Sequence, residues 1–277
     1  MKLQGKTAII TGGGRGIGQA IAFMFAREGA QLLLAARTAA ELAATARHIE
    51  QDGGRADYIQ ADVAEHGDVV RVVEHSLARF GAIDILVNCA GVYGPIGPLV
   101  EVNADAWMKA VQINLCGTFL MCHGLLPHMI ERRRGKIINF SGGGATSPLP
   151  RFTAYGVSKT AVVRLTETLA LEVKEFNIQV NAIAPGAVDT RLQDEVIAAG
   201  EKAGEIADTP IENARNVVDG RADISKDDRP AEQRTEPTEA LMLPMACRQW
   251  RCFLFHSCTQ LSCFGMMVSQ RAVRLRT

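Results

Sequence analysis

The sequence lacks an excess of charge of either sign. Thirty basic residues balance thirty acidic ones among 277, so the formal net charge at pH 7 is zero. A protein of this kind has no overall field that draws it to nucleic acid or to an acidic lipid surface. The run Arg132-Arg133-Arg134 is a local exception, which we interpret as the solvated end of a helix. We therefore expect no nucleic-acid partner.

An apolar signal core is also missing from the first residues, Met1 to Lys6. We identify no later run that is both long enough and sufficiently free of charge to span a membrane. The sequence therefore predicts a cytoplasmic protein without a membrane partner.

Cysteine pairs of the metal-binding kind are absent as well. The four cysteines between residues 247 and 263 include no Cys-x-x-Cys pair, which argues against a zinc site although His256 lies among them. Cys89, Cys116 and Cys122 fall in predicted core elements, as small apolar residues do in a reducing cytosol. We expect no metal site.

What the sequence does contain is a regular alternation of strand-like and helix-like hydrophobic periods. Strands are predicted at residues 6–11, 31–36, 55–61, 83–88, 135–140 and 178–183, and helices at 19–28, 39–50, 69–79, 104–132 and 155–176. This alternation predicts an α/β fold, a doubly wound parallel sheet of the Rossmann type with helices on both faces. We assign residues 1–199 to this single domain.

The remaining residues, 200–277, form an atypical C-terminal region. Residues 208–239 are dense in charge and proline, and residues 240–277 change to cysteine, methionine, arginine and tryptophan without a recognisable final strand. A lid over the substrate, a disordered tail and a shifted reading frame all remain open interpretations. We expect a poorly packed tail that leaves an edge of the sheet uncovered.

A glycine-rich turn joins the first predicted strand to the first predicted helix. It reads Gly12-Gly13-Gly14-Arg15-Gly16-Ile17-Gly18. Glycines let the backbone approach a phosphate closely, and the start of the helix offers unpaired N–H groups and the positive end of its dipole. The strand before this turn and the helix after it supply the context that an isolated glycine cluster lacks. The turn therefore predicts a dinucleotide-binding site.

Tyr155 and Lys159 stand four residues apart, on one face of a predicted helix. A free tyrosine titrates near pH ~10, and a neighbouring cation stabilises its phenolate. Such a pair is suited to exchange a proton with a carbonyl or an alcohol. The alternative is a packed ring beside a solvated charge.

Taken in order, four motifs resemble the classical short-chain dehydrogenase/reductase family: Thr11-Gly12-x-x-x-Gly16-x-Gly18, Asn88-Cys89-Ala90-Gly91, Asn114 and Tyr155-x-x-x-Lys159. The resemblance covers roughly residues 3 to 193. It implies an oxidoreductase that interconverts a small ketone or aldehyde and an alcohol, and that assembles as a homodimer or homotetramer. The alternative function is that of a catalytically impaired relative that acts as an interaction protein.

The resemblance also implies roles for individual residues. Tyr155 would be the acid/base, Lys159 would lower its pKa and hold the nicotinamide ribose, and Asn114 would hold a water; the alternative for Asn114 is a helix kink with a satisfied amide. The implied cofactor contacts are Thr11, Gly12, Arg15, Gly16, Ile17, Gly18, Arg37, Asp62, Val63, Asn88, Ala90, Gly91, Tyr155, Lys159, Pro185, Gly186, Val188 and Thr190.

The choice of cofactor depends on the end of the second predicted strand. A carboxylate there holds the free 2′-hydroxyl of NAD, whereas a 2′-phosphate requires a cation. Residues 33–38 contain no acid, and Arg37 and Arg15 are two candidate cations. Although Arg37 could instead face solvent, the missing acid argues against NAD. The sequence therefore predicts NADP.

One position departs from the family pattern. The residue thirteen places before Tyr155, where relatives usually carry a substrate-orienting serine, is Gly142. We predict that Ser141 replaces this serine, on the assumption that the loop is one residue longer. Ser147, just before Pro148, is the weaker alternative.

Overall fold

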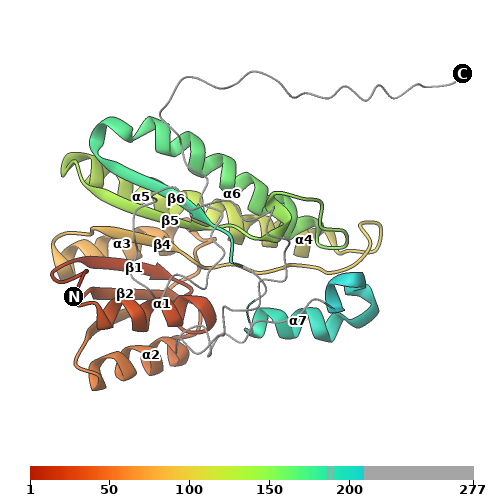
Figure 1. Ribbon diagram of the computed structural model, residues 1–277, viewed down its shortest axis with the longest axis horizontal. Helices are drawn as coiled ribbons and strands as arrows, with labels where there is room; N and C mark the ends of the chain where they lie inside the picture. Colours follow the sequence, from red (N-terminus) through yellow and green to blue (C-terminus); the bar gives the residue numbers. More distant parts are fainter. Residues whose placement is uncertain (186–187, 189, 209–277) are drawn as a thin grey trace, which may run out of the picture.

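The six predicted strands form one parallel sheet (Figure 1). The computed structural model describes residues 1–185, 188 and 190–208. The strands are β1 (Thr7–Thr11), β2 (Gln31–Ala36), β3 (Arg55–Gln60), β4 (Ile85–Asn88), β5 (Gly135–Phe140) and β6 (Ile178–Ile183). They lie in the order β3-β2-β1-β4-β5-β6, and each neighbouring pair is parallel. The predicted doubly wound sheet is confirmed.

The helices are α1 (Gly16–Arg27), α2 (Ala39–Gln51), α3 (His66–Phe80), α4 (Ala104–Val111), α5 (Gly117–Glu131), α6 (Thr153–Glu172) and α7 (Arg191–Ala199). Four predicted helices are present as α1, α2, α3 and α6, the predicted helix 104–132 is divided by a π-helical turn into α4 and α5, and α7 was not predicted. A π-helical turn, Gln112–Cys116, joins α4 to α5, and shorter helical turns occupy Gly143–Ala145, Lys174–Phe176 and Gly200–Asp208.

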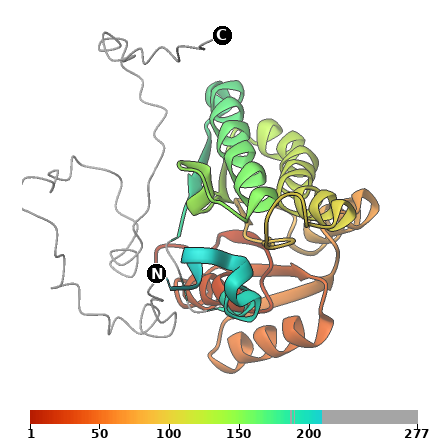
Figure 2. The same cartoon turned by 90° about the vertical axis from the view of Figure 1, so that its right-hand side faces the viewer.

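The sheet is covered on both faces because its strand residues are apolar on both sides (Figures 1 and 2). In β1, Ala8 and Ile10 pack with α1 and α2, while Ile9 between them packs with the cluster of α3, α5 and α6. Alternate residues of a strand point to opposite faces, so an uninterrupted apolar strand needs helices on both sides. This explains why β1 and β2 read as continuous apolar runs.

One stretch, Ala104–Glu131, differs from the expectation drawn from the sequence. By length and composition this helix is apolar enough to cross a membrane. However, 44% of its apolar window is buried inside the protein, where α5 packs against α3 and β5. A single helix that passes this test of length and composition is weak evidence for a membrane span. The expected absence of a membrane partner stays a prediction.

The strand order reverses between β1 and β4, and in such sheets ligands bind at the carboxyl ends of the strands at this point. α7 lies beyond those ends, beside the start of α1 (Figures 1 and 2). The segment Gly200–Asp208 continues from α7, and its Ala203 is buried against Phe152 and Val196. The expectations for the rest of the C-terminal region concern residues outside the described part of the chain.

Candidate active site

A cavity of about 510 Å³ opens at the carboxyl ends of the strands. The glycine turn, the ends of β2 and β3, the segments after β4 and β5, and helices α6 and α7 all contribute to its wall. Most of the predicted site residues line it: Gly12, Arg15, Gly16, Ile17, Gly18, Arg37, Asp62, Val63, Ala90, Gly91, Ser141, Tyr155, Lys159, Pro185 and Thr190. The fold therefore brings these residues together around one space.

Two predicted residues, Thr11 and Asn88, do not line the cavity but hold the elements that do. The Thr11 hydroxyl accepts hydrogen bonds from the backbone N–H groups of Cys89 and Ala90, both at 3.1 Å. Buried Asn88 donates to Asn139 Oδ1 at 2.9 Å, which ties β4 to β5. These contacts fix the loop after β4 against β1. Of the others, Val188 is not among the lining residues, and Gly186 lies outside the described residues.

The glycine turn is built so that its backbone can pack closely. A Cβ on Gly18 would overlap the carbonyl oxygen of Gly12, and one on Gly12 would lie 3.1 Å from the Ala90 backbone. α1 then begins at Gly16, with no side-chain cap from Arg15 and no acidic residue in its first turn. An uncapped helix start is a binding site for anionic phosphate groups. The residues present therefore fit the pyrophosphate of a dinucleotide.

Tyr155 and Lys159 lie in the first two turns of α6, at the inner end of the cavity. The Lys159 side chain is buried, and its Nζ donates a hydrogen bond to the Phe140 carbonyl at 2.7 Å. Burial disfavours the charged ammonium and lowers the pKa of Lys159 to about 8. Its Nζ lies 5.7 Å from the centre of the Tyr155 ring.

The pKa of the Tyr155 phenol is raised in this structure, whereas the sequence predicts that Lys159 lowers it. Burial raises the pKa of Tyr155 above its usual value, and Tyr93 and Cys89 add to this effect. The Tyr93 ring meets the Tyr155 ring edge-on, with centroids 4.7 Å apart. Burial therefore favours the protonated form of the phenol in this structure.

Asn114 occupies the π-helical turn between α4 and α5. Its amide oxygen accepts from Val92 N at 2.9 Å, and its amide nitrogen donates to the Val92 carbonyl and to Ser158 Oγ, both at 2.9 Å. The helix irregularity and satisfied amide are thus present. A Cβ on Gly91 would lie 3.2 Å from Asn114 Oδ1 and 3.3 Å from Lys159 Nζ, so both groups lie close to the Gly91 backbone. The water-holding role of Asn114 stays a prediction.

The predicted role of Ser141 does not agree with this geometry. Its hydroxyl is buried and donates to the Lys159 carbonyl at 3.2 Å. The loop residue that adjoins the phenol is Gly142, whose added Cβ would overlap the Tyr155 hydroxyl and lie 2.7 Å from Cζ.

The physical reason is the direction of the chain after β5. Ser141 N bonds to the Ile183 carbonyl, next to the last pair of the β5–β6 ladder, and Gly142 is extended (φ −174°, ψ 176°). Neighbouring residues in extended backbone point to opposite sides. The Ser141 side chain therefore points to the other side of the loop from Gly142, toward the Lys159 carbonyl, and Ser147 is exposed outside the cavity lining.

Sequence reasoning missed three charged residues of the wall. Glu41 on α2 and Arg191 and Glu195 on α7 line the cavity near Arg15 and Arg37. No motif in the sequence marks any of the three.

The family model described as short chain dehydrogenase matches residues 6–200. The chain belongs to the short-chain dehydrogenase/reductase family. A curated relative, 3beta-hydroxysteroid dehydrogenase 1 of Eggerthella lenta, is 38% identical over 201 residues, which cover 72% of this chain and 77% of that protein. The predicted family is confirmed.

Two solved structures of similar proteins have the same fold. NAD⁺-bound xylitol dehydrogenase has a TM-score of 0.74 and 27% identity, covering 80% of this chain and 92% of that one. A single-substitution variant of actinorhodin polyketide ketoreductase with NADPH has a TM-score of 0.69 and 31% identity, covering 72% and 77%. The family thus binds nicotinamide dinucleotides of both kinds, and its members are oxidoreductases that act on small molecules.

Proposed function

We propose that this short-chain dehydrogenase is an NADP(H)-dependent oxidoreductase that interconverts a ketone or aldehyde and an alcohol. The observation that carries the proposal is that Tyr155 and Lys159 line the same cavity as the glycine turn. A bound nicotinamide would supply or accept hydride at this end of the cavity. Tyr155 would donate the proton to the carbonyl oxygen, or remove it from the alcohol in the reverse direction.

Lys159 and Ser141 would act together on the position of the phenol. The Lys159 ammonium is anchored on the Phe140 carbonyl, and the Ser141 hydroxyl is anchored on the Lys159 carbonyl. These two contacts tie the end of β5 to the first turns of α6. Lys159 would also contact the nicotinamide ribose, while Asn114 would hold a water behind it, and Ser141 would serve as a positioning residue.

The preference for NADP is supported by two positively charged side chains, Arg15 and Arg37, which mark what we call the outer end of the cavity. Arg15 and Arg37 both line it, and the last residues of β2, Ala35 and Ala36, offer no carboxylate for a ribose 2′-hydroxyl. A phosphomonoester forms strong charge-assisted hydrogen bonds with a guanidinium. The cofactor would therefore lie with its adenosine half near Arg37, with Asp62 and Val63 beside the adenine.

We further propose a cytoplasmic homodimer or homotetramer whose catalytic domain is residues 1–199. Apolar side chains stand exposed on three helices: Met108 on α4, Phe119 on α5, and Val157 and Leu171 on α6. Exposed apolar side chains on neighbouring helices support an interface there. The free thiols of Cys89, Cys116 and Cys122 suit a reducing compartment.

An NADPH oxidation screen over 3-oxoacyl thioesters, steroid ketones, sugars and small diketones tests the proposal. Loss of reduced-nicotinamide absorbance with the wild type, but not with Tyr155→Phe, supports it. If the wild type binds cofactor but consumes neither NADPH nor NADH with any substrate class, the chain is the impaired relative, which the family match does not favour.

A further inference from the structure

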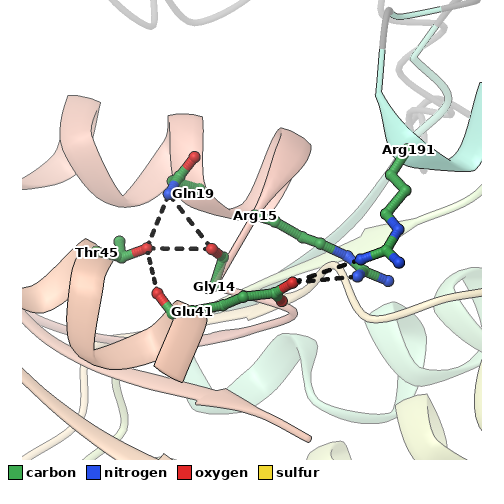
Figure 3. Close-up of polar contacts among 6 residues, drawn as sticks. All are labelled: Gly14, Arg15, Gln19, Glu41, Thr45 and Arg191. Carbon is green, nitrogen blue, oxygen red and sulfur yellow. Dashed lines mark hydrogen bonds and ion pairs between the residues drawn. The ribbon is translucent and has the colours of Figure 1, made fainter. Parts of the chain in front are cut away.

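The outer end of the cavity already contains carboxylates opposite its cations. Glu41 Oε1 lies 3.3 Å from Arg15 Nη1 and 3.7 Å from Arg191 Nη1 (Figure 3). Glu41, Arg15 and Arg191 all line the cavity. One carboxylate thus engages two guanidinium groups from separate elements, the glycine turn and α7.

The position of Glu41 is fixed by a buried contact between α2 and the glycine turn (Figure 3). The buried Thr45 hydroxyl lies 3.0 Å from the Glu41 carbonyl and 3.2 Å from the Gly14 carbonyl, and it accepts from Gln19 Nε2 at 2.9 Å. A Cβ on Gly14 would lie 3.0 Å from Glu41 Cβ. The first turn of α2 therefore packs directly on the turn that carries Arg15.

A second carboxylate, Glu195 on α7, faces the same cations. Burial raises its pKa, while Arg15, Arg191 and Arg37 act in the opposite direction. Three arginines and two glutamates thus share this end of the cavity. An incoming phosphomonoester would find Arg15 and Arg191 paired with Glu41, and it would be repelled by that carboxylate.

We infer that Glu41 is a cofactor-specificity residue, whose carboxylate competes with the 2′-phosphate of NADP for Arg15 and Arg191. The competition reduces the discrimination that Arg37 gives against NAD. This inference rests on the proposed NADP dependence. The pairs are partly exposed, with side-chain accessibilities of 47% for Arg15, 69% for Arg191 and 29% for Glu41, so competition moderates binding without abolishing it.

Adenosine 2′,5′-bisphosphate and adenosine 5′-monophosphate test this inference without any catalytic step, because they differ only in the 2′-phosphate. Both are titrated calorimetrically into the full-length wild type, Glu41→Gln, Glu195→Gln and Glu50→Gln. Glutamine keeps the shape and removes the charge. Glu50 is the matched control, an exposed glutamate on the same helix outside the cavity lining.

We expect Glu41→Gln to bind the bisphosphate about threefold to fivefold more tightly, in keeping with a partly exposed ion pair. Its affinity for the monophosphate should stay within about twofold, since a merely structural effect of Glu41 would change both ligands alike. Glu50→Gln should match the wild type for both.

Bisphosphate binding that is unchanged or weaker in Glu41→Gln overturns the inference. A gain found only in Glu195→Gln overturns it as well, because the competing carboxylate would then be on α7. The proposed NADP preference is judged separately, by whether the wild type favours the bisphosphate over the monophosphate. The shift in that ratio between wild type and Glu41→Gln reports on Glu41 whichever ligand the wild type prefers.

Discussion

The two ends of the cavity are built in different ways. At the nucleotide end, close backbone packing of the glycine turn and the uncapped start of α1 form the phosphate cradle. At the catalytic end, Lys159 is buried and Tyr155 is partly buried. The contacts of these side chains depend on which side of the loop after β5 each loop residue faces. A phosphate site built from the backbone tolerates variation in neighbouring side chains. At the catalytic end, by contrast, moving the serine by one position, from 142 to 141, takes its hydroxyl away from the phenol.

Tyr155→Phe should give the largest effect and should separate the two ends. Removing the phenolic proton should lower kcat by at least about a thousandfold, within the range for loss of a general acid. The cofactor dissociation constant should remain within about twofold, because the cradle is intact. Steady-state kinetics and a fluorescence titration of NADPH measure the two quantities. A kcat near that of the wild type would remove Tyr155 from the chemistry.

Lys159→Met should stabilise the folded protein at pH 7. The pKa of Lys159 falls from 10.5 to about 8 on folding, so the unfolded chain binds more protons between these values and stability rises with pH across this window. Below pH 8 the full cost of the buried cation is present, about 3 kcal/mol by proton linkage.

Urea unfolding of Lys159→Met and of the wild type at pH 7 and pH 10 measures this cost. The variant should be more stable by about 2–3 kcal/mol at the lower pH, and this advantage should shrink at the higher one. A variant that is less stable at neutral pH would show that Lys159 contributes more as a hydrogen-bonded cation than its burial costs.

Gly18→Ala should damage the nucleotide end. The added Cβ would overlap the Gly12 carbonyl, and relief of such overpacking costs about 1–3 kcal/mol of folding stability. Cofactor binding should weaken with it. Gly67→Ala is the matched control, since Gly67 also lies in the first turn of a helix, α3, and a Cβ there meets nothing within 4 Å. Equal denaturation midpoints for the two variants would show that the turn can relax.

Arg37→Ala should give a smaller effect at the same end. We expect NADPH to bind at least about tenfold more tightly than NADH to the wild type, equivalent to ~1.4 kcal/mol. The substitution should remove most of that difference by weakening NADPH alone. Parallel titrations of both cofactors measure it, and equal affinities in the wild type would contradict the assignment of Arg37.

The sequence was most informative where backbone geometry governs the structure. All six strands were predicted within two residues of their observed starts and one of their ends, because buried parallel strands are apolar along their whole length. The glycine turn was predicted because steric requirements leave only glycine at Gly18. The pairing of Tyr155 with Lys159 followed from helical spacing.

Sequence was least informative where burial and side-chain direction decide. The raised pKa of Tyr155 and the lowered pKa of Lys159 follow from the tertiary packing around them. Ser141 was expected beside the phenol because a displacement of one residue looks small in sequence, yet in extended backbone it reverses the side chain. Glu41 meets Arg191 only through the placement of α7.

The most direct test of the account is kcat for Gly142→Ser, measured beside Gly142→Ala and Gly143→Ala with one active substrate. The phenol of Tyr155 fills the space that a side chain at Gly142 would need, whereas a Cβ on Gly143 meets nothing within 4 Å. We predict that both Gly142 variants lose at least about tenfold in kcat and that Gly143→Ala retains it. An increase in kcat for Gly142→Ser, with Gly142→Ala unchanged, would contradict the account by showing that the loop has room for a side chain beside the phenol.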